Sequence, residues 1–317
     1  MSRQHRIRII RSRHRTALVG CAALVLALGV SGCGSEEPVE PTTPTGTTTT
    51  ATETPTAAPT TSPDDGVEPT PTTTDDADGG EVSGIPVYYI GDSGGSFRLY
   101  REWRTVPDEG DPVESALAAM MAVPPLDPDY MSPWVAPDEM EVEREGSNIT
   151  VDLSADAFSG NAGSELSATA IQQLVYTATA AATLDGEPAT TVTILVDGAA
   201  ADAWGHVRVG EPTVRAPQGE VLSHVWILSP QEGDVVDAGE VRISGYGASF
   251  EAHFNYTIDG PSGTVEGFTL SDNGAGFAEF RFTEELEPGE YTVTVENSSG
   301  LGEEFIPFVD SKTFTVR

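Results

Sequence analysis

The run from Ser147 to Gly198 constrains the fold most, because it places two strand patterns on either side of a helix pattern. Residues 149–153 alternate apolar and polar side chains, which is typical of a half-buried strand. From Ser164 to Thr183 the apolar residues recur at helical spacing and form one stripe. Residues 190–196 are rich in β-branched side chains and end at an Asp-Gly pair. The run therefore predicts a strand–helix–strand unit.

The helix pattern also carries two local predictions. Ser164 or Ser167 is the expected cap at its start, because a serine hydroxyl accepts the free N–H groups of a first turn. Gln172 and Gln173 are expected to face away from the apolar stripe.

Three segments of this run resemble the best-marked segments of the sporulation and spore-germination domain called GerMN. They are Val151-Asp152-Leu153-Ser154, residues 172–179 and Ile194-Leu195-Val196-Asp197-Gly198. Residues 87–89 and 99–102 are similar to the first two strands of that domain, and residues 113–121 to its first helix, so the resemblance covers residues 85–216. It implies a small α/β module similar to ring-building motifs, found in envelope proteins that assemble with other proteins and not known for catalysis.

The segment ahead of this run contains a predicted hairpin, a predicted helix and three arginines. Residues 86–90 and 97–104 alternate as strands around a loop rich in turn formers, residues 112–122 form a helix pattern capped by Asp111, and residues 139–144 supply a further strand. Cations are scarce in this chain, but three occur here: Arg98, Arg101 and Arg104. They form either an anion-recognising patch that contacts a partner or, as we favour, local salt bridges to the many carboxylates.

Beyond a hinge at residues 216–220, apolar and polar residues alternate throughout, and about seven short strands separated by turn signals predict an antiparallel sandwich. Four segments resemble the immunoglobulin-like domain of bacterial spore germination: residues 227–230, 243–245, 248–252 and 297–300. This resemblance spans residues 222–317 and implies an adhesive or scaffolding module. The expected fold class is therefore α+β, a GerMN-like α/β module (85–216) followed by an immunoglobulin-like β-sandwich (222–317), each folding separately.

The loop from Leu301 to Asp310 contains an apolar cluster that includes Phe305 and Phe308. We expect these phenylalanines to cover one end of the sandwich. The alternative is that they form an exposed contact for a partner protein.

The first 32 residues match a lipoprotein signal peptide. Six arginines in residues 3–15 precede a 14-residue apolar run, which is too short for a membrane span, and Val30-Ser31-Gly32-Cys33 resembles a lipobox. The resemblance implies that Cys33 carries the lipid that anchors the mature protein to the outer face of the cell membrane. The alternative is an ordinary secretory signal with an incidental cysteine.

Residues 33–84 are rich in Thr, Pro and acidic residues without apolar periodicity, which predicts a disordered tether.

The composition excludes several classes of function. The chain has 16 basic and 50 acidic residues, a net charge of −34, which repels phosphate backbones and excludes nucleic acid as a partner. The acidic cluster Asp75-Asp76-Ala77-Asp78 lacks the register of a calcium loop, and His206, His224 and His253 lie in no catalytic motif. We therefore expect no metal, no cofactor and no enzymatic activity.

The predicted function is that of a cell-surface lipoprotein acting by protein contact in envelope assembly or in a process like sporulation or germination. One alternative is an extracytoplasmic receptor that binds a glycan or another ligand by stacking on Trp103, Trp134 or Trp204, although a core role is expected for each. Another is a modulator of a sensor kinase, as some actinobacterial lipoproteins with GerMN-like domains are.

Overall fold

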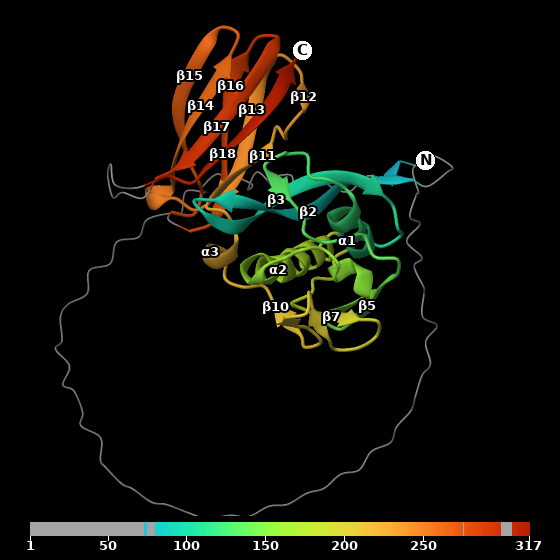
Figure 1. Cartoon of the computed structure of the whole chain (residues 1–317). Helices are drawn as coiled ribbons and strands as arrows, with labels where there is room; N and C mark the ends of the chain where they lie inside the picture. Colours follow the sequence, from blue (N-terminus) through green and yellow to red (C-terminus); the bar gives the residue numbers. More distant parts are fainter. Residues whose placement is uncertain (1–72, 75–79, 275, 299–305) are drawn as a thin grey trace, which may run out of the picture. The chain divides into compact units, whose positions relative to one another are not determined.

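The computed structural model describes residues 73–74, 80–274, 276–298 and 306–317. The predicted signal peptide, the lipidated Cys33, nearly all of the predicted tether and Phe305 lie outside the described residues. Figure 1 shows the helices and strands in their order along the chain. Within the described part, no helix combines the length and the apolar character that a bilayer crossing requires.

The first sheet is built on a long hairpin of β2 (Glu81–Ser93) and β3 (Ser96–Pro107). At the other edge of β2, β1 (Thr73–Thr74) and β4 (Tyr130–Met131) pair with its two ends. The predicted hairpin is confirmed. Both strands run beyond their predicted limits, because the facing pair of Val82 and Val106 continues the buried pattern. Residues 73–74 and 81–84, which the sequence predicts as disordered tether, therefore lie in strands β1 and β2.

The predicted strand–helix–strand unit is confirmed. β6 (Asn148–Leu153) and β7 (Thr191–Val196) are parallel, and α2 (Ser164–Ala181) forms the crossover that a parallel pair requires. β5 (Met140–Glu145) pairs with β6, and β10 (Thr213–Val214) pairs with β7, in the strand order β10-β7-β6-β5.

Two helices pack against the β2–β3 hairpin, α2 and α1 (Pro112–Ala122). Asp111 caps α1 as predicted, since its Oδ1 accepts the N–H of Val113 at 2.7 Å. α2 starts at Ser164 with Gly163 in the cap position and no side-chain cap bond, so the predicted serine cap is wrong.

The buried face of α2 is wider than the predicted stripe. Gln173 is fully buried, so the expectation that it faces away is wrong, and its Nε2 donates to the backbone oxygen of Tyr88 at 2.9 Å. Thr177 Oγ1 accepts the N–H of Tyr88 at 3.1 Å. These polar side chains can be buried because β2 supplies both hydrogen-bond partners.

Short elements complete the first domain: η1 (Ala155–Phe158), β8 (Asp202–Ala203), β9 (Val207–Arg208) and α3 (Gln218–Val221). α3 occupies much of the segment predicted as a hinge.

The second domain is the predicted sandwich, drawn in orange and red in Figure 1. One sheet has the order β11-β13-β16 and the other β12-β18-β17-β14-β15, and every pair is antiparallel except β12–β18. The elements are β11 (Val225–Ser229), β12 (Val235–Val236), β13 (Gly239–Gly247), η2 (Phe250–Ala252), β14 (His253–Gly260), β15 (Gly263–Leu270), β16 (Ala278–Leu286), β17 (Gly289–Asn297) and β18 (Val309–Val316). Phe254, Phe280 and Phe314 are buried in its core.

Strand β11 is buried on both faces and belongs to both hydrophobic cores. Val225 and Ile227 pack into the core of the sandwich, whereas Trp226 and Leu228 pack into the core of the first domain. Successive side chains of a strand point to opposite faces, so an uninterrupted apolar run fills both sides. The two domains thus share one strand in their packing.

We expect Leu228→Ala to destabilise the protein by about 2–5 kcal/mol, because it opens a cavity where the two cores meet. Leu270→Ala is the matched control, since Leu270 is 56% exposed and its loss should change the unfolding free energy by about 0.5 kcal/mol at most. Urea unfolding followed by circular dichroism measures both. Equal midpoints for the two variants would contradict the shared packing.

Candidate functional site

The three arginines that stood out in the sequence do not form one patch. Alternation along β3 places Arg101 on one face and Arg98 and Arg104 on the other. Arg104 is 8% exposed and ion-pairs with Glu102 at 2.7 Å, whereas Nη1 of Arg98 donates to the backbone oxygen of Gly219 at 3.0 Å. Among the described residues, the favoured salt bridge is therefore found for Arg104 and not for Arg98 or Arg101.

The Arg104–Glu102 pair fixes the loop after α1. Arg104 Nη1 donates to the backbone oxygen of Pro124 at 3.0 Å, and the Glu102 carboxylate accepts the N–H groups of Leu126 and Asp127 at 2.9–3.1 Å. Both buried charges are satisfied by protein partners, so this pair has a structural role.

Lys312, the only lysine of the chain, lies at the centre of a buried cluster. It is 3% exposed, and its Nζ lies 2.9 and 3.0 Å from the two carboxylate oxygens of Asp310 and 2.8 Å from the hydroxyl of Tyr130. It also donates to Asp127. Lys312 and Asp310 come from β18 of the sandwich, and Asp127 and Tyr130 from the first domain.

The cluster is closed by further hydrogen bonds. Asp310 accepts the N–H of Ile227 at 2.7 Å and the hydroxyl of Tyr130 at 2.8 Å, and Asp127 accepts the N–H of Asp129 at 2.8 Å. Burial lowers the pKa of Lys312, but the Asp310 and Asp127 carboxylates raise it by a larger amount. The net shift of the pKa is therefore upward, which favours the ammonium form. The upward shift stabilises the folded protein fully at pH values below the pKa of Lys312 in the unfolded chain, about 10.5. This stabilisation is lost as the pH rises through the higher pKa of Lys312 in the folded protein.

Lys312→Met should destabilise the protein by about 3–5 kcal/mol, because it leaves two carboxylates buried without a counter-charge. Adding Asp127→Asn removes one of those charges and keeps an oxygen for the N–H of Asp129, so the double variant should recover part of the loss. Urea unfolding at pH 7 measures both variants. A double variant that is no more stable than the single one would show that the cluster is not held by charge pairing.

Phe308 lies against the first domain and is partly buried. Its ring stacks on His224 with centroids 4.4 Å apart, and its N–H donates to Asn297 Oδ1 at 2.9 Å. A Cβ built on Gly94, in the β2–β3 turn, would lie 3.5 Å from the ring. Ile306 beside it is 82% exposed. Phe308 therefore packs as a covering residue, and Phe305 is outside the described residues.

His224 is held neutral by its surroundings. Burial lowers its pKa, and the guanidinium of Arg98 lowers it further. Its Nδ1 is buried with no hydrogen-bond partner among the described residues.

We expect stability to fall as the pH drops from about 7 to 5, since the unfolded histidine binds a proton near pH 6.5 and the folded one resists it. His224→Phe retains a ring against Phe308 and cannot titrate, so its unfolding free energy should depend less steeply on pH. Thermal unfolding across that range measures the slope. Identical slopes for the variant and the parent chain would rule out this assignment.

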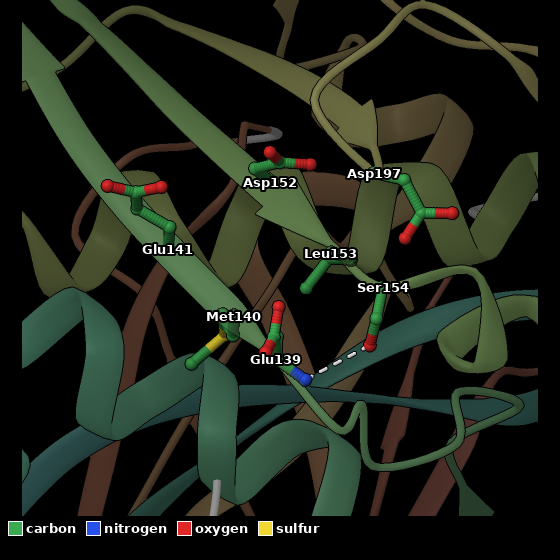
Figure 2. Close-up of a pocket in the computed structure, with 7 residues that line it drawn as sticks. All are labelled: Glu139, Met140, Glu141, Asp152, Leu153, Ser154 and Asp197. Carbon is green, nitrogen blue, oxygen red and sulfur yellow. Dashed lines mark hydrogen bonds between the residues drawn. The ribbon is translucent and has the colours of Figure 1, made fainter. Parts of the chain in front are cut away.

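The acid-rich pocket in Figure 2 lies at the ends of β5, β6 and β7 and has a volume of about 70 Å³. Four carboxylate residues line it: Glu139, Glu141, Asp152 and Asp197. Asp152 accepts the N–H of Gly198 at 2.9 Å, Asp197 accepts that of Ala155 at 3.3 Å, and Ser154 accepts that of Glu139 at 3.0 Å. Two of the carboxylates are thus engaged in turns, and no group of three or more metal-ligating side chains is assembled within the described ranges.

The tryptophans proposed as stacking residues have different surroundings. Trp134 is 4% exposed and packs edge-on with Phe158 and Trp204, at centroid distances of 5.3 and 4.9 Å. This places both tryptophans in the first core, as the favoured interpretation expects. Trp103 is half-buried beneath the guanidinium of Arg101.

The two remaining histidines make local contacts. His206 Nε2 lies 3.0 Å from the hydroxyl of Ser167, and its Nδ1 lies 2.8 Å from the backbone oxygen of Trp204. Ser167 is fully buried within α2, so this pair links the β8–β9 turn to the helix. His253 stacks on Phe268 with centroids 4.9 Å apart.

Comparison with protein families identifies both domains. Residues 86–202 match the family described as sporulation and spore germination, and residues 224–302 match the immunoglobulin-like domain of bacterial spore germination. The predicted resemblance, the order of the two domains and the fold class are therefore confirmed. Two families of this kind support a role in sporulation or germination.

Other comparisons add little. No curated protein matches the chain. A chain from a structure of T cell activation by the bacterial superantigen toxic shock syndrome toxin-1 is similar over 29% of this chain and 99% of its own, with 11% identity and a TM-score of 0.20. An engineered protein is similar over 47% of this chain and 36% of its own, with 14% identity and a TM-score of 0.22. These likenesses are too weak to carry an argument.

Proposed function

We propose that this chain, in which a sporulation and spore-germination domain precedes the immunoglobulin-like domain of bacterial spore germination, is a lipid-anchored surface protein that acts by contact with an envelope protein. The presence of both domains in this order is the observation that carries the proposal. The anchor is Cys33, and the proposed location is the extracytoplasmic face of the cell membrane.

The sequence supports a contact at a distance from the membrane. The part of the predicted tether that precedes β1, residues 33–72, comprises about forty positions, which would span roughly 120 Å in extended polyproline form. A spacer of that length suits a folded part that reaches through the cell wall to a partner. The shared strand β11 and the buried Lys312 cluster support the role further, because through them both domains contribute residues to common packing contacts.

The proposed mechanism uses association and no catalytic step. The chain has 50 acidic and 16 basic residues, so a partner with a basic face would be attracted over a distance that shrinks with added salt. The expected signature is an association rate that falls as the ionic strength rises.

Cys33→Ala should release the protein from the membrane or leave its precursor uncleaved, because the lipid and the processing both require that sulfur. Membrane fractionation and mass spectrometry of the extracted protein measure this directly, and an unmodified Cys33 at a membrane-bound N-terminus would contradict the anchor. In the same cells, crosslinking to an envelope partner should be lost with the anchor.

A histidine double variant, His206→Gln with His253→Gln, separates contact from catalysis. When it is expressed in a deletion strain, this variant should correct the envelope, sporulation or germination defect as fully as the parent chain does. Failure to restore it, with folding and partner crosslinking intact, would overturn the non-enzymatic mechanism.

A further inference from the structure

A cavity of about 290 Å³ lies in the first domain where the β2–β3 hairpin meets the C-terminal end of α2. Its lining combines apolar side chains with two guanidinium groups and the hydroxyls of Tyr88 and Thr183. Tyr88, Trp103 and Leu184 supply apolar wall, and Arg101 and Arg215 supply the charge. Small-ligand sites combine apolar walls with a few convergent polar groups.

Arg101 enters the cavity without a protein counter-charge. Its guanidinium carbon lies 4.6 Å from the centre of the Trp103 ring, which supports one face of the group. Its Nε is buried and has no hydrogen-bond partner among the described residues, and none of them forms an ion pair with it. Its hydrogen-bonding capacity is therefore unused.

Arg215 is held in place by α2. Its Nε donates to Thr179 Oγ1 at 2.6 Å, its Nη2 donates to the backbone oxygen of Tyr176 at 3.2 Å, and its guanidinium carbon lies 4.6 Å from the centre of the Tyr176 ring. These contacts fix the plane of the group and leave Nη1 without a partner in the described part of the chain. Arg215 and Thr183 also line an adjoining cavity of about 350 Å³, so Arg215 lies between the two.

Arg101 and Arg215 form no ion pair within the described residues, and neither do Arg98, Arg242 and Arg317. Arg104 has Glu102, and Arg144 has Asp111 and Asp185. What distinguishes Arg101 and Arg215 is that they line one cavity with no carboxylate among its lining residues, so an anion placed there would be attracted by both.

We propose that this cavity binds a carboxylate joined to an apolar or aromatic group, as a small molecule or as the end of a chain. A planar carboxylate matches the donor fork of a guanidinium, and the apolar part would pack against Tyr88, Trp103 and Leu184. This site is independent of the lipid anchor and of the proposed envelope partner.

The test compares benzoate with benzamide, which share a shape and differ in charge. Calorimetric titration of the full-length protein in 150 mM salt should show saturable binding of benzoate and at least tenfold weaker binding of benzamide. Inorganic phosphate is the third probe, and it should bind more weakly than benzoate because it has no apolar part. Equal affinities for benzoate and benzamide, no binding of either, or tighter binding of phosphate would each overturn the proposal.

Charge-removing variants locate the site. Arg101→Gln and Arg215→Gln should each weaken benzoate binding about tenfold, whereas Arg242→Gln, the same change at an exposed position of β13, should leave it unchanged. Circular dichroism checks the fold of each variant. If a variant does not fold, the comparison of benzoate with benzamide on the unaltered protein still decides. Unchanged benzoate affinity in both folded cavity variants would place the binding elsewhere and refute the assignment.

Discussion

The burial of one ammonium group between two carboxylates determines how the two domains meet. Removing each ion from water costs several kcal/mol, and that cost is offset only when every donor and acceptor finds a partner. Around Lys312 this condition is met by Asp127 and Tyr130 from one domain and by Asp310 from the other. A docking shifted by one residue would leave buried charges unpaired, whereas apolar surfaces alone tolerate such shifts. The cluster therefore contributes mainly to the specificity of the arrangement, and the shared packing of β11 contributes most of the attraction.

The sequence predicts the elements of this protein better than it predicts their contacts. The periods of residues 149–153 and 164–183 reveal a strand and a helix because one face of each is apolar. The run from Val225 to Leu228 carries a further readable signal, since four consecutive apolar residues are typical of a strand buried on both sides. The pairing of Lys312 with Asp127 is different: the residues are 185 positions apart, and in a chain with 50 acidic side chains no local pattern selects the partner. The separation of Arg101 from Arg98 and Arg104 is different, since the period of two in the predicted strand at residues 97–104 already places Arg101 on the opposite face.

The segments that resemble the family have a structural explanation in this chain. Val151-Asp152-Leu153-Ser154 and the Asp197-Gly198 pair end neighbouring parallel strands, and the Asp152 carboxylate accepts the Gly198 N–H across the sheet. Asp197 and Gly198 both take positive φ, of 50° and 79°, so the chain reverses sharply there, and Asp152 holds the reversal. Figure 2 shows the acidic side chains gathered around this turn. Acidic side chains at the ends of neighbouring strands could be taken for a catalytic cluster. Two of them, Asp152 and Asp197, instead accept backbone N–H groups and stabilise turns.

Further contacts between the domains lie along the outer edge of β3, which has no neighbouring strand among the described residues of the first sheet. Leu99 and Leu222 form an isolated bridge there, and the N–H of Ser223 donates to the backbone oxygen of Leu99 at 3.1 Å. Further along, the side-chain amide of Gln231 accepts the N–H of Trp103 at 2.8 Å and donates to its backbone oxygen at 2.7 Å, as a neighbouring strand would. An uncovered edge of this length invites pairing with other chains. Each domain has its own complete hydrophobic pattern, which is why separate folding is predicted from the sequence, but the first domain alone would expose this edge together with the buried carboxylate of Asp127. Its folding in isolation therefore depends on whether its own core compensates for both.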